Sequence, residues 1–340
     1  MSRRVLVTGG AGYVGAMLVP KLLARGHHVR VLDSYYFSGE PLAALRGAAG
    51  LQEIEADIRD REAVKRAVHG CDSVIHLACI SNDPSFELDP QLAKTINYDA
   101  FPVLVDESKR AGVGRFVFVS SSSVYGVSEA DRVTEEHPLK PLTDYSKYKA
   151  LCEPILLDAQ SSGFTTLVLR PATVCGFSTR MRFDLAVNIL TSHAVTRRKI
   201  TVFGGTQTRP NIHIDDVTDL YVDVLEEREE LIAGQTFNVG YQNQTLAKLA
   251  DIVKTVVETE LPHLAPVNIE TTPTDDNRSY RVDSEKIARV LGYRPRRTIE
   301  DAVRDLCRAF RNGSFPYPMD DPRYYNVQLM KNKSTVPSVA

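Results

Sequence analysis

The chain has 340 residues, enough for about two domains at roughly 150 residues each and for a sizeable core without disulfide or metal staples. Its 41 basic and 43 acidic residues leave a net charge of −2, which argues against nucleic acid as a partner, because that binding depends on clustered positive charge. No apolar run approaches the roughly 18 to 20 residues of a membrane span, so we expect no membrane partner either.

The amino terminus and the cysteines indicate in which cellular compartment the protein is expected. Val5–Val7 is too short for the apolar region of a signal peptide. The five cysteines are odd in number, widely scattered and without a Cys-x-x-Cys pair, which disfavours a disulfide framework and a zinc site. We therefore expect a cytoplasmic protein with no metal.

The first 33 residues have the pattern of one βαβ unit. Arg4–Thr8 is predicted to be a buried strand, a glycine-rich turn ends it, Tyr13–Arg25 has helical spacing, and His28–Asp33 is a second strand. The alternation continues through strands at Asp72–Leu77, Arg115–Ser120 and Thr165–Arg170 and helices at Gln91–Ala111 and Tyr145–Ser161. This order predicts an α/β protein with a Rossmann-type, doubly wound parallel sheet covered by helices on both faces.

The pattern becomes less regular after Pro171. Helices are predicted at Phe183–Thr196, Asp215–Glu227, Thr245–Glu258 and Ser284–Leu291, with a short strand at Ile200–Phe203. We assign 1–171 to the first domain, with 209–240 returning to it, and 172–208 with 241–311 to a smaller, interleaved substrate domain. Residues 312–340, rich in Pro, Asn, Ser and Tyr, are expected to be a tail that packs on the surface or is disordered.

The turn after the first strand predicts a dinucleotide site. Gly9, Gly12 and Gly15 allow a tight turn, close approach of a pyrophosphate and close packing of the helix. Asp33 ends the second strand, where a carboxylate can accept hydrogen bonds from ribose hydroxyls. Ser34 follows it, with no adjacent arginine for a 2′-phosphate, which favours NAD over NADP. Asp57 is either near the adenine or an ordinary loop residue.

Tyr145 and Lys149 are four residues apart and share one helix face. A tyrosine hydroxyl ionises near pH 10, so a neighbouring ammonium that favours the phenolate would make it usable as a base. The pair alone is a common pattern, but a serine run, Ser120–Ser123, follows the strand that precedes it. A serine there faces the crevice in which open α/β sheets bind ligands, although one or two of these four are expected to be only solvated turn residues.

The chain resembles the extended short-chain dehydrogenase/reductases in six motifs that follow one another in the same order. These are the glycine turn, Asp33, His76-Leu-Ala, Ser-Ser-Ser-Val-Tyr-Gly126, Tyr145-x-x-x-Lys149 and Arg209-Pro-Asn-Ile-His-Ile-Asp-Asp216. Within these, the chain is similar to the NAD-dependent sugar-nucleotide epimerase/dehydratase family over about residues 4 to 310. The resemblance implies Ser121, Tyr145 and Lys149 as the catalytic residues, Tyr145 being the acid/base, and Arg209 as a clamp on the substrate diphosphate rather than a surface salt-bridge residue. It also implies NAD as cofactor, a nucleoside-diphosphate sugar as substrate, and a homodimer formed through the helices at Gln91–Ala111 and Tyr145–Ser161.

The expected binding residues form two sets. The cofactor set is Gly9, Gly12, Tyr13, Val14, Gly15, Asp33, Asp57, Ile58, Leu77, Ala78 and Lys149. The substrate set is Ser81, Asn82, Ser122, Thr173, Arg180, Arg182, Arg209 and Arg278. We expect the four arginines to gather in one cleft of an otherwise neutral molecule.

Departures from the family pattern reduce the number of reactions that the enzyme is expected to catalyse. Ser122 and Ser123 stand where 4,6-dehydratases of the family carry Asp-Glu, so dehydration is not expected. Thr173 and Cys175 replace the asparagine and tyrosine usual in hexose 4-epimerases, which leaves the particular sugar open. The favoured prediction is inversion of C4 of a nucleoside-diphosphate sugar through a transient 4-keto intermediate. The alternatives are an NAD(P)-dependent reductase or dehydrogenase of a keto-sugar nucleotide and a non-catalytic dinucleotide sensor or scaffold.

Overall fold

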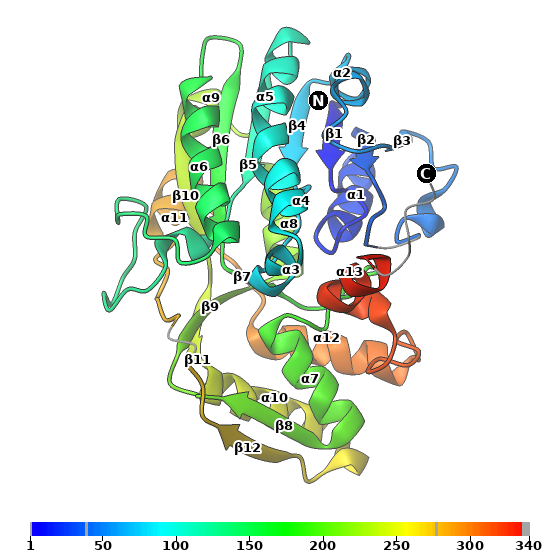
Figure 1. The fold of residues 1–340 in the computed structure, drawn as a ribbon, viewed down its shortest axis with the longest axis vertical. Helices are drawn as coiled ribbons and strands as arrows, with labels where there is room; N and C mark the ends of the chain where they lie inside the picture. Colours follow the sequence, from blue (N-terminus) through cyan, green and yellow to red (C-terminus); the bar gives the residue numbers. More distant parts are fainter. Residues whose placement is uncertain (1, 38–39, 276–277, 335–340) are drawn as a thin grey trace.

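A computed structural model describes residues 2–37, 40–275 and 278–334 (Figure 1). Seven parallel strands form one sheet in the order β10-β6-β5-β4-β1-β2-β3. The strands are β1 (Arg4–Thr8), β2 (His28–Asp33), β3 (Leu51–Glu55), β4 (Ser73–His76), β5 (Arg115–Val119), β6 (Thr165–Pro171) and β10 (Gln235–Val239). The predicted fold class is confirmed.

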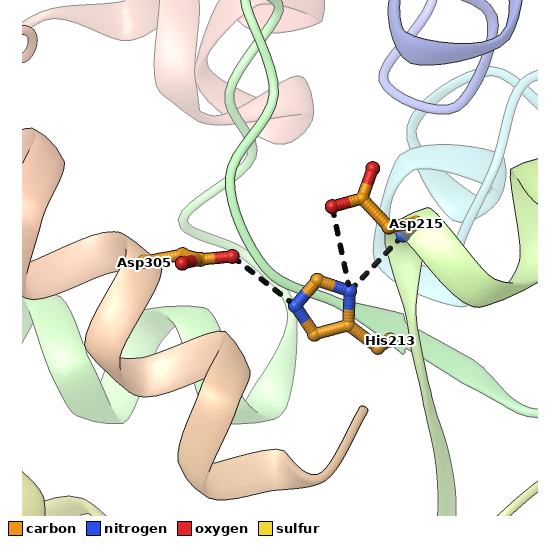
Figure 2. A group of neighbouring side chains, drawn as sticks. All are labelled: His213, Asp215 and Asp305. Carbon is orange, nitrogen blue, oxygen red and sulfur yellow. Dashed lines mark hydrogen bonds and ion pairs between the residues drawn. The ribbon is translucent and has the colours of Figure 1, made fainter. Parts of the chain in front are cut away.

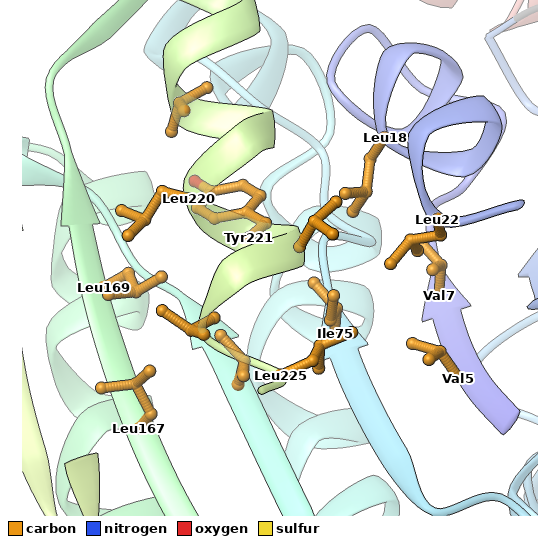
Figure 3. Packing of buried hydrophobic residues seen from close by; sticks show 14 of the residues in the cluster. Val5, Val7, Leu18, Leu22, Ile75, Leu167, Leu169, Leu220, Tyr221 and Leu225 are labelled. Atoms are coloured by element: carbon orange, nitrogen blue, oxygen red, sulfur yellow. The ribbon is translucent and has the colours of Figure 1, made fainter. Parts of the chain in front are cut away.

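Alternate side chains of each strand enter one of two cores. Val5 and Val7 of β1 face the layer of α1 (Gly15–Ala24) and α8 (Ile214–Asp223), which Figure 3 shows from close by. The other face packs against α2 (Arg61–Val68), α5 (Ala100–Arg110) and α6 (Asp144–Asp158). Both faces are therefore dry, as the near-continuous apolar strands require.

The chain reverses its direction of winding between β1 and β4, which are neighbours in the sheet. Because consecutive crossovers run to opposite sides of this point, the loops after β1 and β4 diverge and leave a crevice at the carboxyl edge of the sheet. The functional side chains lie around it.

A second layer of helices lies beyond that edge (Figure 1). Its core joins α7 (Ala186–Arg197), α10 (Leu246–Glu260) and α12 (Ile299–Arg311) to the two-stranded sheet of β8 (Lys199–Phe203) and β12 (Asn268–Thr272). Shorter helices are α3 (Asp83–Leu88), α4 (Pro90–Lys94), α9 (Glu229–Ile232) and α11 (Glu285–Leu291). The helix predicted over Gln91–Ala111 is divided by a π-helical turn at Thr95–Asp99, directly before α5.

Residues 209–240, expected to return to the first domain, include strands of two sheets. β9 (Thr208–His213) pairs with β7 (Thr173–Cys175) and β11 (Gln242–Thr245) in a separate three-stranded sheet. In the large sheet, β10 pairs with β6. Strand β9 pairs instead with β7, the short strand that follows β6 in the chain. Helix α8, which follows β9, does pack on the first domain against α1.

The carboxyl-terminal segment corrects the prediction of a surface tail. Phe315 and Tyr324 pack around the buried ring of Phe183, and Met330 of α13 (Asn326–Ser334) lies in a cluster with Ile80 and Phe86. Their aromatic and apolar surface draws the segment into the molecule. Residues 335–340 of the expected tail lie outside the described residues.

His213 joins the two layers where β9 meets α8 (Figure 2). Its Nδ1 accepts a hydrogen bond from the Asp215 amide at 3.0 Å, which places the proton on Nε2, 3.4 Å from the Asp305 carboxylate of α12. The side chain is fully buried. We interpret this group as a structural link and not as a catalytic one. No helix in the described part of the chain is long and apolar enough to cross a membrane.

Candidate active site

A cavity of about 520 Å³ lies at the carboxyl edge of the large sheet and is lined by the loops after β1, β2, β4, β5 and β6. The structure brings every expected site residue to its wall. These are Gly9, Gly12, Tyr13, Val14, Gly15, Asp33, Asp57, Ile58, Leu77, Ala78, Ser81, Asn82, Ser121, Ser122, Tyr145, Lys149, Thr173, Arg180, Arg182, Arg209 and Arg278.

The glycine turn is as tight as the sequence requires. A Cβ at Gly9, where φ is +73°, would lie 2.6 Å from the amide nitrogen of Ala78. A Cβ at Gly15 would lie 2.4 Å from the Gly9 carbonyl oxygen. Side chains at these positions would fill the turn or push apart the strands, so the bare backbone forms a cradle at the start of α1 that fits a pyrophosphate.

Asp33 stands beside this cradle with its carboxylate fixed by backbone groups. Oδ2 accepts a hydrogen bond from the Ala11 amide at 2.9 Å, and Oδ1 accepts one from the Tyr35 amide at 2.8 Å. Burial raises the pKa of Asp33, and these bonds oppose the shift. The remaining lone pairs suit ribose hydroxyls, so the residues present fit an adenine dinucleotide. Asp57, further along the wall, forms an ion pair with Arg59 at 2.6 Å, which lowers the pKa of its carboxyl.

Helix α6 carries Tyr145 and Lys149 into the cavity and begins at a capping box. The Thr143 hydroxyl accepts a hydrogen bond from the Ser146 amide, and the Ser146 hydroxyl accepts one from the Thr143 amide. The Tyr145 hydroxyl lies near the Ser121 hydroxyl, which lowers its pKa. The Lys149 ammonium donates to the Val119 carbonyl at 2.8 Å, at the end of β5. The three residues expected to be catalytic therefore converge from β5 and α6.

The electrostatic environment of Tyr145 differs in part from the expectation. Burial is the main cause that raises the pKa of Tyr145, and Cys79 and Asp83 raise it further. Arg182 and the Ser121 hydroxyl lower it. The cation seen to favour the phenolate in this state is therefore Arg182, and the pKa-lowering role expected of Lys149 stays a prediction.

The four serines after β5 have different partners. Ser120 donates to Glu153 at 2.6 Å within the buried Arg170–Glu153 pair, so it belongs to the core. Ser122 is buried and lies 3.1 Å from the hydroxyl of Tyr280. Ser123 contacts the Ser121 hydroxyl at 2.9 Å, which leaves Ser121 as the serine that faces Tyr145.

Arg182 is held among polar groups from distant parts of the chain. Its guanidinium donates to both oxygens of Asp184, at 2.8 and 3.1 Å, and to the Ser81 hydroxyl at 2.7 Å. Asn82 donates to the same Asp184 at 3.0 Å and has a φ of +74°, a conformation rare for a non-glycine residue. Such backbone strain persists only where surrounding contacts maintain it.

Arg278 forms an ion pair with Asp83, whose other oxygen accepts a hydrogen bond from Thr143 at 2.6 Å. Arg209 and Arg278 both act on Tyr280, lowering its pKa against the larger effect of burial. The arginines thus form two groups, Arg180 with Arg182 and Arg209 with Arg278, on the wall of one cavity.

Among the polar residues of this wall that sequence reasoning did not single out are Asp184, Tyr280 and Asn326. Asp83 also lies on the wall, within the segment Ser81–Ser85 that the sequence predicts to line the sugar pocket. Asp184 and Tyr280 are each two residues from a predicted arginine. Asn326 had no signal, because it is in the segment taken for a tail.

The chain matches the model of the "NAD dependent epimerase/dehydratase family" over residues 5–240. It is 30% identical over 312 residues to a dTDP-glucose 4,6-dehydratase of Streptomyces griseus, covering 89% of this chain and 92% of that protein. It is also 30% identical over 320 residues to a UDP-glucose 4-epimerase of Mycolicibacterium smegmatis, covering 92% and 99%.

Solved structures agree with this result. A dTDP-glucose 4,6-dehydratase of Streptomyces venezuelae with NAD bound superposes with a TM-score of 0.80 at 26% identity, covering 91% of this chain and 97% of that one. A UDP-glucose 4-epimerase of Thermotoga maritima gives a TM-score of 0.80 at 25% identity, covering 91% and 99%.

The doubly wound sheet, its glycine cradle and the Ser-Tyr-Lys group define an NAD-dependent enzyme of the extended short-chain dehydrogenase/reductase type. More narrowly, the chain belongs to the NAD-dependent epimerase/dehydratase family.

Proposed function

We propose that this enzyme inverts C4 of a nucleoside-diphosphate sugar through a transient 4-keto intermediate. The proposal is carried by Ser121, Tyr145 and Lys149, which meet in the cavity that also holds the glycine cradle. NAD, when bound, supplies the acceptor and then the donor of the C4 hydride.

Tyr145 is the group that moves the proton. Its hydroxyl, as phenolate, takes the proton of the sugar C4 hydroxyl and returns it when the carbonyl is reduced on the other face. Ser121 holds the same sugar oxygen, since its hydroxyl is close enough to Tyr145 to lower the pKa of that residue. Lys149 is anchored by the Val119 carbonyl, which fixes its ammonium at the end of β5, where it can bind the nicotinamide ribose.

The second arginine group is proposed to bind the substrate diphosphate. Arg209 and Arg278 line the cavity next to Tyr280, and a guanidinium can engage phosphate oxygens in a bidentate manner. Arg182, close enough to Tyr145 to lower its pKa, is placed for the sugar itself. The relatives that act on UDP- and dTDP-linked hexoses support a nucleotide sugar as the substrate class.

The acid groups of the cavity disfavour dehydration. A 4,6-elimination needs a carboxyl that protonates the leaving hydroxide, and positions 122 and 123 carry serines that bond to Tyr280 and Ser121. Asp83 is a carboxylate near Tyr145, yet both its oxygens are engaged, one by Thr143 and one by Arg278. Hydride transfer and its reversal on the same carbon need no such acid.

The test is incubation of the purified enzyme with a panel of UDP-, dTDP-, GDP- and CDP-sugars, followed by NMR of the sugar ring. We expect one sugar to give an equilibrium mixture of C4 epimers without added cofactor, with NAD still bound to the protein. Accumulation of a 4-keto-6-deoxy sugar would contradict the proposal. So would net oxidation or reduction that consumes cofactor from solution.

The homodimer expected through the helices at Gln91–Ala111 and Tyr145–Ser161 stays a prediction. In the structure these segments correspond to α4–α5 and α6, which lie side by side on one face of the sheet. Light scattering at micromolar concentration would check it.

A further inference from the structure

Residues 176–182 pass directly over the glycine cradle. The Tyr13 hydroxyl donates to the Gly176 carbonyl at 2.7 Å, and the Ser178 hydroxyl donates to the Tyr13 carbonyl at 2.7 Å. These two bonds fix the segment on the residue between Gly12 and Val14. Arg180, two residues after Ser178, lines the cavity close to this attachment.

Arg180 lies where the two halves of the cavity meet, since Asp33 and Phe37 are on its cofactor side, and Asn326 links it to Asp184 and Ser81 on the other side. Its guanidinium carbon lies 5.4 Å from the centre of the Phe37 ring, four residues after Asp33, and Asp33 and Arg180 act on each other's pKa. Nη2 donates to the Asn326 side-chain oxygen at 2.6 Å, and Nε has no hydrogen-bond partner. Arg180 is only 4% exposed.

The charge of Arg180 is not matched by an acid at contact distance. Asp184 directs both its oxygens to Arg182, and no described carboxylate lies within ion-pair distance of Arg180. Burial, with a smaller effect of Arg182, accordingly lowers the pKa of Arg180 to about 9. A buried cation with an unsatisfied N–H is unfavourable unless an anion completes the site.

We propose that Arg180 binds the pyrophosphate of NAD and closes the cradle from the side opposite the glycine turn. The dinucleotide is the anion that the cofactor half of the cavity is shaped for, and a guanidinium donates well to phosphate oxygens. Asn326 is then a positioning residue that orients the guanidinium. Arg180 leaves the expected substrate set, and the diphosphate of the sugar is left to Arg209 and Arg278.

A 2′-phosphate of NADP is the competing anion, and Asp33 argues against it. Its carboxylate is fixed beside the cradle by the Ala11 and Tyr35 amides, so a 2′-phosphate would meet a negative charge at the ribose. The positive charge of Arg180 partly offsets the negative charge of Asp33, but the Asp33 carboxylate still lies where a 2′-phosphate would be. The proposal therefore keeps NAD as the cofactor.

The test measures cofactor binding and so does not depend on the sugar reaction. We compare the wild-type protein with Arg180→Gln, Arg180→Lys, Asn326→Ala and the control Arg323→Gln, whose side chain is mostly exposed and pairs with Asp321. NADH affinity is titrated by fluorescence, and the NAD that remains on each protein after gel filtration is released and quantified.

We expect Arg180→Gln to bind NADH at least about tenfold more weakly, as for a lost charge-assisted hydrogen bond, with Arg180→Lys between it and the wild type. Arg323→Gln should match the wild type, and Asn326→Ala should stay within about threefold of it. If Arg180→Gln binds NADH as tightly as the wild type, the proposal is wrong. If Arg180→Gln does not fold, Arg180→Lys decides, and an NADH affinity equal to that of the wild type would overturn the proposal.

Two further outcomes would also overturn it. Equal losses in Asn326→Ala and Arg180→Gln would mean that Arg180 only anchors the carboxyl-terminal segment. The wild type could also bind NADPH more tightly than NADH. If Arg180→Gln removed that preference, Arg180 would be assigned to a 2′-phosphate. In both cases the proposed C4 inversion could still hold, because NMR of the sugar reports on it separately.

Discussion

The two halves of the cavity are built in opposite ways. On the cofactor side, Asp33 accepts hydrogen bonds from Tyr35 and Ala11, residues 2 and 22 positions away in the chain. On the substrate side, Arg182 reaches Ser81 across 101 positions, and Arg278 reaches Asp83 across 195. The carboxylate on the cofactor side is held by local backbone geometry, although Gly176 and Ser178 reach Tyr13 from far along the chain, whereas the substrate side consists of side chains that only the folded chain brings together.

This difference separates two kinds of defect. Changes on the cofactor side act on a strained, close-packed turn and should alter stability and NAD binding together. Changes on the substrate side act on polar side chains at the cavity wall and should alter turnover or KM while NAD remains bound. The predictions below are designed to test this separation.

The largest effect is expected for Tyr145→Phe, which removes the proton-transferring hydroxyl and keeps the ring. Turnover should fall by about 10² to 10⁴-fold, while the NAD content stays at the wild-type level. Tyr148→Phe is the matched control, because Tyr148 lies on the same helix and packs its ring 5.6 Å from Phe86. Full turnover in Tyr145→Phe would show that another base acts.

Gly15→Ala tests the cofactor side. The new Cβ would lie 2.4 Å from the Gly9 carbonyl, so the turn must open, at an expected loss of about 1–3 kcal/mol in the free energy of unfolding and with loss of bound NAD. Gly114→Ala is the control, since the nearest atom to its Cβ would be 3.7 Å away. Urea unfolding and NAD release measure both effects. A Gly15→Ala protein with normal stability and NAD content would contradict the close-packed cradle.

The acid response of stability should come partly from His76 on β4. Burial, and then Lys149, lower the pKa of His76 to about 3 from an ordinary value of 6.5. Below pH 6.5 the unfolded chain takes up a proton that the folded chain does not, so stability is lost as the pH falls from about 6.5 toward 3. The loss from this residue is about 2 kcal/mol at pH 5.

His76→Gln removes the titrating group and serves as the comparison for that loss. Unfolding free energies of both proteins at pH 7 and pH 5 give the difference, which should be smaller in the variant. Equal losses in the two proteins would mean that His76 is protonated in the folded state or that its site admits water.

The smallest effect is expected for Asp83→Asn on the substrate side. The change removes the ion pair that holds Arg278 and weakens the contact to Thr143, the cap of the helix that carries Tyr145. KM for the nucleotide sugar should rise about tenfold with NAD content unchanged. Asp131→Asn, at a fully exposed side chain, should behave as the wild type. Loss of NAD in Asp83→Asn would break the separation of the two halves.

Much of the fold and about half of the site can be predicted from the spacing of residues along the sequence. The period of apolar residues fixed β1, β2, β4, β5 and β6 close to their observed bounds, because strands buried on both faces must be apolar throughout. The glycines and Asp33 were identifiable because their requirement is local, a turn without side chains followed by a carboxylate at a strand end.

What the sequence missed has a common physical cause. The segment from Phe315 to Met330 looked like a tail, because its Pro and Asn content hides aromatic residues whose partner, Phe183, lies about 130 positions earlier. The four arginines were expected to gather around one diphosphate, yet Arg180 contacts Asn326 and the Phe37 ring and Arg278 pairs with Asp83.

The sequence by itself determined the sheet, the glycine cradle, the Ser-Tyr-Lys group and the family, since each depends on short-range spacing. Only the tertiary structure decided which polar partners each arginine has, which partners the four serines have and that Asn326 belongs to the wall. Charge compensation in a buried cavity depends on distances between side chains from many segments, and residue order alone does not contain those distances.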